Sequence, residues 1–227
     1  MPQLPEHQPL KTDEVFRFHC HAGISCFTDC CRQLELALTP YDVLRLKKAL
    51  GLTSDRFLEQ YTVIEFEPED LYPRVYLGML DDGRASCPFV NAEGCQVYDD
   101  RPGACRTYPL GRGASLKAQG TEAIHILIRE PHCHGFAEEQ EQTLSQWQNN
   151  QNLREYNCYN DEMLAIINHP DLLAGRRMSR KQADDFILCL YDLDRFRKKT
   201  AAGSKDDTAL LTLAIKWFIT QHLSSSS

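Results

Sequence analysis

Eight cysteines lie between residues 20 and 133 of this 227-residue chain, and thiols in that number are suited to binding metal. They are spaced Cys20-x5-Cys26-x3-Cys30-Cys31, then Cys87-Pro88-x6-Cys95-x9-Cys105, and finally Cys133. Thiolates are soft ligands that favour zinc and iron–sulfur clusters. Each of the eight stands beside glycine, proline, histidine or a turn rather than in an apolar stripe. Burial as a small apolar residue therefore does not account for them.

The spacing between the cysteines narrows the kind of site. No two cysteines are separated by two residues, which argues against a thioredoxin-like redox pair and against ordinary zinc knuckles. Cys30 and Cys31 are adjacent, and adjacent side chains diverge by about 100° in a helix or point to opposite faces of a strand. The pair therefore favours two neighbouring metal centres, or one multinuclear cluster reached from two sides.

Two cysteines are left out of this set. Cys189 lies between Leu188 and Leu190 in a helical pattern and fits a small buried apolar residue. Cys158 is expected to be structural or free.

Histidines and arginines near the cysteines could assist the site. Four histidines flank Cys20 and Cys133, where they could ligate or tune a metal, although such a neighbour is more often outside the ligand shell or exposed: His19, His21, His132 and His134. Three arginines could offset thiolate charge, or could equally be surface or turn residues: Arg101, Arg106 and Arg112.

The composition limits the class of protein. The chain is long enough to bury a core without cross-links, with 42% hydrophobic and 25% charged residues. It has no apolar run near the roughly 18 residues of a membrane span, and its polar start lacks a secretory signal. We expect a cytoplasmic protein without membrane contact, in which clustered thiols bind metal or perform catalysis. The net charge of -7 and the lack of a long basic stripe argue against a nucleic-acid partner.

The rest of the sequence predicts an α+β fold: a small cysteine-rich metal-binding core with short hairpins and helices, followed by a helical C-terminal extension. The expected parts are a flexible N-terminal arm (1–13), a cysteine-cluster domain (14–137), a helical extension packed on it (138–223) and a disordered tail (224–227).

Local signals predict individual elements. Thr39, Pro40 and Gly51 bound a helix, and another helix begins at Thr53 or Ser54. Residues 75–80 and 84–90 are expected to pair as a hairpin, with a second turn at 91–94 and a strand at 124–128. Ser179 and Gln182 form a capping box that opens a helix with apolar positions as far as Leu193, and a last helix spans 207–223.

These motifs resemble the YkgJ-type cysteine-cluster family over about residues 16–136. The match is strongest from Cys87-Pro88-Phe89 through Cys95, Tyr98 and Arg101-Pro102 to Cys105-Arg106 and Tyr108-Pro109. Phe18 and the first four cysteines match the opening motif, with gaps of five and three residues where the family has two, and Cys133-x-Gly135 matches the closing motif. The resemblance implies zinc or iron chelation by eight ligands: Cys20, Cys26, Cys30, Cys31, Cys87, Cys95, Cys105 and Cys133.

Three functions remain open at this point. The first is a metal-binding protein that holds zinc or iron, including iron in an iron–sulfur cluster. The second is a protein-modifying, methyltransferase-like enzyme that uses the metal centre, since flagellin lysine N-methylase proteins resemble the family in their cysteine motif. The third is a metal chaperone or interaction module whose C-terminal helices bind a protein partner. No glycine-rich cofactor loop supports the enzyme.

Overall fold

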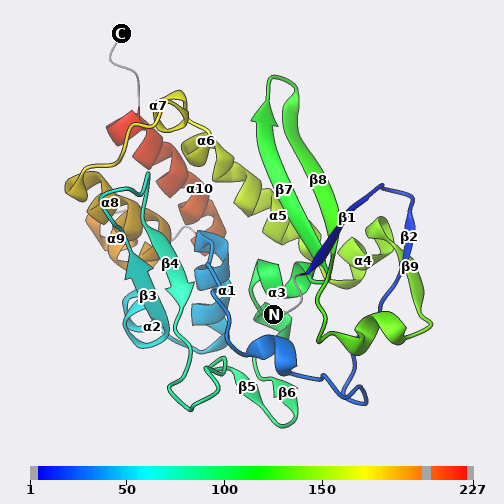
Figure 1. Ribbon diagram of the computed structural model, residues 1–227. Coiled ribbons are helices and arrows are strands. Elements are labelled where there is room, and N and C mark those ends of the chain that lie inside the picture. Colours follow the sequence, from blue (N-terminus) through cyan, green and yellow to red (C-terminus); the bar gives the residue numbers. More distant parts are fainter. Residues whose placement is uncertain (1–4, 201–205, 224–227) are drawn as a thin grey trace.

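The computed structural model describes residues 5–200 and 206–223, so the expected tail at 224–227 lies outside the described residues. The fold is α+β, as the sequence predicts. Figure 1 shows the helices α6 to α10 on one side of the molecule and the sheet of β1, β7 and β8 on the other. No described helix is long and apolar enough to cross a membrane.

The helices are spread along the chain from residue 40 to residue 223. The N-terminal helices are α1 (Pro40–Ala49), α2 (Ser54–Tyr61) and α3 (Gly103–Thr107). The C-terminal helices are α4 (Leu144–Asn150), α5 (Leu153–Glu162), α6 (Leu164–Ile167), α7 (Pro170–Leu173), α8 (Arg180–Phe186), α9 (Leu193–Thr200) and α10 (Asp207–Phe218). π-helical turns continue α8 over Ile187–Tyr191 and α10 over Ile219–Leu223. Short 3-10 turns lie at Asp29–Cys31, Tyr98–Asp100 and His134–Ala137.

Among the described residues, the strands form four small antiparallel sheets. One sheet has the order β1 (Glu6–Leu10), β8 (Gly120–Arg129), β7 (Leu110–Lys117). The other three are pairs: β2 (Val15–Arg17) with β9 (Glu141–Thr143), β3 (Thr62–Glu65) with β4 (Arg74–Leu77), and β5 (Val90–Asn91) with β6 (Gly94–Cys95).

The predicted helix signals are confirmed. The Thr39 side chain accepts from the backbone N–H of Asp42, and the Asp42 carboxylate accepts from the backbone N–H of Thr39, so α1 begins with a full capping box. Gly51 has a φ of 65°, which lets the chain leave the helix. Ser179 and Gln182 cap α8 in the same way, and the last helix spans 207–223 with its final turn π-helical. The predicted apolar face from Ala183 to Leu193 is divided between α8 and α9.

The predicted hairpin of 75–80 with 84–90 is wrong. Strand β4 pairs instead with β3, which follows α2 without a turn residue between them. The Asp81-Asp82-Gly83 segment does reverse the chain, with Leu80 N–H donating to Ser86 O at 2.8 Å. Ser86 then forms an isolated bridge with Arg32, so the segment that leads to Cys87 is tied to the first cysteine group.

Two further differences concern strands. In the segment expected to be a flexible arm, Glu6–Leu10 forms β1 and pairs with Ile126, Leu127 and their neighbours in β8. The predicted strand at 124–128 is confirmed within the longer β8, whereas its partner β7 was not predicted. Gly111 and Gly113 obscured the strand pattern of β7, and they are needed because Cβ atoms there would lie 2.9 and 3.2 Å from Ile126 and Ile124.

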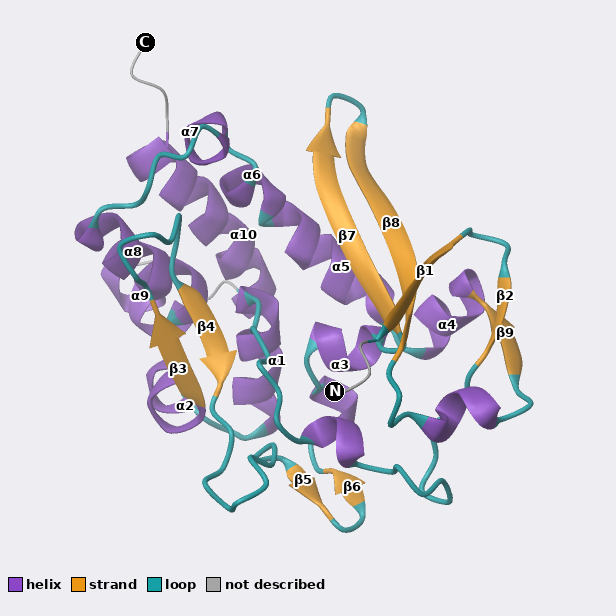
Figure 2. Cartoon of the chain, in the orientation of Figure 1, coloured by secondary structure: helices purple, strands orange, loops and turns teal. Residues whose placement is uncertain are grey.

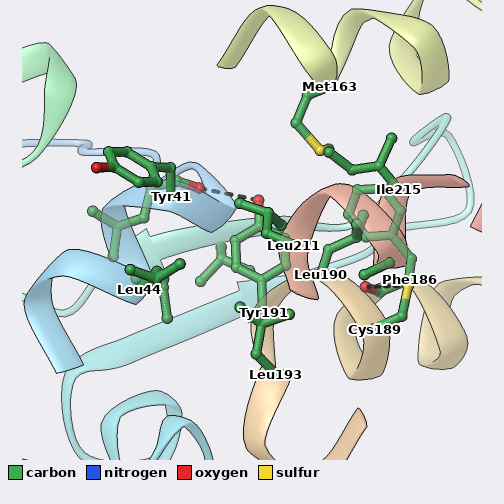
Figure 3. Close-up of a cluster of buried hydrophobic side chains, with 14 of the residues drawn as sticks. Tyr41, Leu44, Met163, Phe186, Cys189, Leu190, Tyr191, Leu193, Leu211 and Ile215 are labelled. Atoms are coloured by element: carbon green, nitrogen blue, oxygen red, sulfur yellow. Dashed lines mark hydrogen bonds between the residues drawn. The ribbon is translucent and has the colours of Figure 1, made fainter. Parts of the chain in front are cut away.

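Two hydrophobic clusters hold the fold together. The first, called here the large core, draws on both sides of the expected boundary at residue 138, and Figure 3 shows Leu44, Phe186, Leu190 and Ile215 within it. The second, called here the small core, consists of residues from the β1–β8–β7 and β2–β9 sheets and from the start of the C-terminal helices: Leu10, Phe16, Phe18, Leu110, Leu127, Leu144, Trp147 and Leu153. Cys87 and Cys95 pack against the large core, and Cys133 packs against the small core.

Candidate metal centre

Three cysteines gather beside the small core, and we call Cys20, Cys26 and Cys133 the small-core group. Backbone hydrogen bonds join the segments that carry them, with His19 N–H donating to Gly135 O at 2.9 Å. The backbone N–H of His134 donates to Cys26 Sγ at 3.1 Å. Cys20 also feels the charges of Cys26 and Cys133, which raise its pKa. Cys133 therefore lies in the neighbourhood of Cys20 and Cys26, although it is distant from both in the sequence.

Gly135 allows this close approach. A Cβ at this position would lie 2.7 Å from Phe18 Cε2 and 3.1 Å from the backbone oxygen of His19. The aromatic ring and the backbone both belong to the segment that leads to Cys20, so a side chain would push the two cysteine segments apart.

Replacing Gly135 with alanine is therefore expected to lower the free energy of unfolding by about 1–3 kcal/mol, the usual cost of overpacking. Urea denaturation measures this loss. The matched control is Gly78→Ala, since a Cβ at Gly78 would lie 3.5 Å from Tyr61 O, an ordinary contact. Equal stability of the two variants would contradict the steric role of Gly135.

Four cysteines gather beside the large core, and we call Cys31, Cys87, Cys95 and Cys105 the large-core group. Cys87 N–H donates to Cys31 O at 2.8 Å, and Val90 N–H donates back to Cys87 O at 3.2 Å. The β5–β6 hairpin then places Val90 opposite Cys95. Figure 2 shows that the chain around this hairpin is mostly loop.

Cys105 is positioned by the start of α3. Gly103 N–H donates to the buried Asp42 carboxylate of α1 at 2.7 Å. Asp42 thus anchors the beginnings of both α1 and α3, and neither role was predicted from the sequence. Burial raises the pKa of Cys105 to about 12, and the charges of Cys87 and Asp42 act in the same direction. The residue keeps an exposed surface even though many atoms surround its thiol.

Cys30 and Cys31 are adjacent in the 3-10 turn Asp29–Cys31. Cys31 belongs to the large-core group, and Cys30 is a member of neither group. A hydrogen bond between the two thiols lowers the pKa of Cys30 to about 7 and raises the pKa of Cys31. Besides Cys30, the thiols of Cys87 and Cys105 raise the pKa of Cys31, and both belong to the large-core group. Cys30 contributes to the raised pKa of thiols in both groups, including Cys20 and Cys95.

The electrostatics of these thiols fit a bound cation. Burial is the main cause that raises the pKa of Cys20 to about 11, and it also raises the pKa values of Cys87, Cys95 and Cys133. Neighbouring thiols add to every one of these shifts, and a cation would reverse this mutual repulsion. The hydroxyl of Tyr108 is buried beside Cys133, and its hydrogen bond acts to lower the pKa of that thiol. A Cys133 thiolate would accept from it.

The cysteines left out of the set lie elsewhere. Cys189 is fully buried in the large core, where its thiol donates to Phe186 O at 3.7 Å. Cys158 is exposed on α5 and lines a cavity of about 540 Å³ with Arg106, Tyr156 and six other residues. None of the eight clustered cysteines lines that cavity.

The three arginines differ in their relation to the thiols. Arg101 is buried, lies 3.7 Å from the Tyr98 ring centroid, and its charge acts to lower the pKa of both Cys20 and Cys95. Arg106 donates to backbone oxygens of Asp99, Arg101 and Gln151, so it shapes the loop before α3. Arg112 pairs with Asp161 at 2.7 Å. Arg101 is thus the arginine whose charge reaches thiols of both groups.

The flanking histidines have polar partners. His134 Nδ1 lies 2.6 Å from Ser25 Oγ, and His132 Nε2 lies 3.4 Å from Glu130. Among the histidines, cysteines and acids of residues 5–200 and 206–223, one set of at least three places its ligand atoms within 4.8 Å of one another. This set comprises His19, His21 and Glu138. The eight thiols are gathered more loosely than that, so their ligand roles stay a prediction.

Comparison with known proteins places this arrangement in a family. No curated protein and no solved structure matches the chain. A family model named CxxCxxCC, described as "Putative zinc- or iron-chelating domain", matches residues 19–147, which is more than half of the chain. The match spans all eight clustered cysteines and confirms the resemblance inferred from their spacing. The chain therefore belongs to this family of zinc- or iron-chelating domains.

Proposed function

We propose that this protein chelates zinc or iron at two neighbouring centres, each with four thiolates. The small-core group together with Cys30 forms one centre, and the large-core group forms the other. The observation that carries this proposal is that the hydrogen bonds between the cysteine-bearing segments fall into two separate sets. Cys31 is joined to Cys87 through the backbone, whereas Cys26, Cys20 and Cys133 are joined through the segments at His19 and His134.

The adjacent pair explains why there are two centres. Two successive side chains are awkward ligands for one tetrahedral ion because their directions diverge. The large-core group has four members with Cys31, and the small-core group reaches four with Cys30. Each centre then has the four-thiolate set that suits zinc or an iron–sulfur cluster. The buried charge of Arg101 would offset part of the negative charge of both.

Chelation is better supported than a methyltransferase-like activity. An enzyme would need an open coordination position or a substrate cavity at the thiols. Two cavities, of about 540 and 360 Å³, are lined by none of the eight cysteines. Thiolate centres of this kind persist where disulfides are disfavoured, so we place the protein in the cytoplasm.

Metal and sulfide analysis of single-cysteine variants, purified anaerobically, tests this proposal. Cys26→Ala and Cys87→Ala are each expected to lose about half of the bound metal, and the double variant nearly all of it. Stoichiometric sulfide with visible absorption would identify iron–sulfur clusters, and a colourless protein with zinc would identify zinc.

Cys158→Ala is the matched control, because it removes an exposed thiol outside both groups, and it should keep the full metal content. Circular dichroism establishes that each variant remains folded. Loss of all metal from either folded single variant would replace two centres with one shared centre. Full metal in the folded double variant would exclude these thiols as ligands.

A further inference from the structure

A second kind of metal-binding side chain lies beside the small-core group. His19 and His21 flank Cys20, and their rings are 4.8 Å apart between centroids. Glu138 reaches them from the segment after Cys133, with Oε2 at 3.4 Å from His21 Nε2. One nitrogen of each imidazole and one carboxylate oxygen all lie within 4.8 Å of one another.

The backbone fixes where these three residues meet. Phe18 N–H donates to Gln140 O at 3.1 Å, and His19 N–H donates to Gly135 O at 2.9 Å. These two hydrogen bonds enclose the point where Glu138 faces the histidines. Gly23 stabilises the His21 ring from the other side, with its N–H donating to Nδ1 at 3.1 Å. A Cβ at Gly23 would lie 3.0 Å from that ring, so glycine permits the contact.

We infer that His19, His21 and Glu138 form a third metal site, separate from the thiolates, for a divalent first-row transition ion such as Zn²⁺. Two imidazoles and one carboxylate are a ligand set that binds such ions and leaves coordination positions open to water. Bonds of about 2.1 Å from a tetrahedral ion place its ligand atoms roughly 3.4 Å apart. The three side chains are partly or fully exposed, so small rotations can close the remaining gap.

Binding changes the hydrogen bonds of His21 in a defined way. His21 Nδ1 accepts from Gly23 N–H, so the ring proton sits on Nε2 and faces Glu138. An ion bound at Nε2 takes that position, and the neutral ring carries its proton on Nδ1, exchanged through solvent. The hydrogen bond from Gly23 is then lost, which opposes binding. Bonds from the ion to three ligands outweigh that loss.

This site is distinct from the proposed thiolate centres. The Cys20 thiol is not among the atoms that lie within 4.8 Å of one another. An ion at the histidines is therefore bound by nitrogen and oxygen, with affinity and spectra unlike those of a thiolate centre.

Calorimetric titration of Zn²⁺ into the full chain, purified with its tightly bound metal in place, tests this inference. The expected result is one further equivalent of Zn²⁺ that binds after the thiolates are filled. His21→Gln and Glu138→Gln are each expected to weaken this binding at least tenfold. Co²⁺ bound there should show none of the intense near-ultraviolet absorption that sulfur ligands cause.

His7→Gln is the matched control, because His7 is an exposed histidine on β1 outside the cluster, and it should leave the further equivalent unchanged. Absence of this equivalent, or its persistence at full affinity in His21→Gln, would overturn the inference. The tightly bound metal is measured before the titration. Its absence would count against the proposed thiolate centres and not against the histidine site.

Discussion

Removal of the metal is expected to unfold the cysteine-bearing segments while the helices of the large core stay folded. On the proposed function, the metal joins segments that have little regular structure of their own: the 3-10 turn at Asp29–Cys31 and the two-residue strands β5 and β6. Structural zinc contributes roughly 10–16 kcal/mol of folding free energy in small zinc-binding peptides. Without the metal, repulsion between the thiolates and the conformational entropy of the loops would both favour unfolding of these segments.

Native-state hydrogen exchange after anaerobic chelation measures this effect. Amides around Cys31, Cys87 and Cys95 are expected to exchange at least about a hundredfold faster, since each factor of ten corresponds to about 1.4 kcal/mol. Amides of α10 serve as the internal control, because Leu210, Leu211 and Phe218 are fully buried in the large core. Unchanged exchange around the cysteines in metal-free protein would show that packing alone holds these segments.

Local signals made part of this fold predictable. The Thr39 capping box, Pro40 and Gly51 all act within a few residues, so the structure of α1 follows from its own sequence. The adjacent Cys30 and Cys31 carried similar local information, because their adjacency alone favours two neighbouring centres or one multinuclear cluster. The structure brings the segments of Cys20, Cys26 and Cys133 together, and the ligand roles of the eight cysteines await the metal analysis.

Long-range contacts were not predictable from one sequence. Thr62, Val63 and Ile64 are β-branched and typical of a strand, but nothing local indicates that β4 pairs with them rather than with residues 84–90. Glu138 looks like any surface acid until Gly135 brings its segment to His19 and His21. The hydrogen bond from Gly103 N–H to the Asp42 carboxylate joins residues 61 positions apart, and no local signal indicates it.

Replacing Asp42 with alanine is expected to have the second large effect, because this carboxylate connects the fold to the site. Its two oxygens accept from Thr39 N–H and Gly103 N–H at 2.8 and 2.7 Å, and the side chain is almost fully buried. Alanine leaves two donors without a partner, at about 1–3 kcal/mol each. We expect the free energy of unfolding to fall by about 2–5 kcal/mol, measured by urea denaturation.

Asp42→Asn separates the charge of this side chain from its hydrogen bonds. Burial raises the pKa of Asp42, so the neutral amide avoids the cost of a buried charge. Its single oxygen satisfies one of the two donors, and we therefore expect a loss smaller than that of Asp42→Ala. The matched control is Asp55→Ala, since Asp55 occupies the first turn of α2 but is exposed. That variant should lose much less stability than Asp42→Ala.

The same variants test whether Asp42 positions Cys105. If the start of α3 depends on this carboxylate, Asp42→Ala should bind metal more weakly at the large-core group while the small-core group keeps its metal. A general loss of stability would lower the metal content of both centres together. The ratio of metal bound at the two centres therefore distinguishes a positioning role of Asp42 from a merely structural one. Equal retention of metal at both centres in Asp42→Ala would show that α3 holds Cys105 without help from α1.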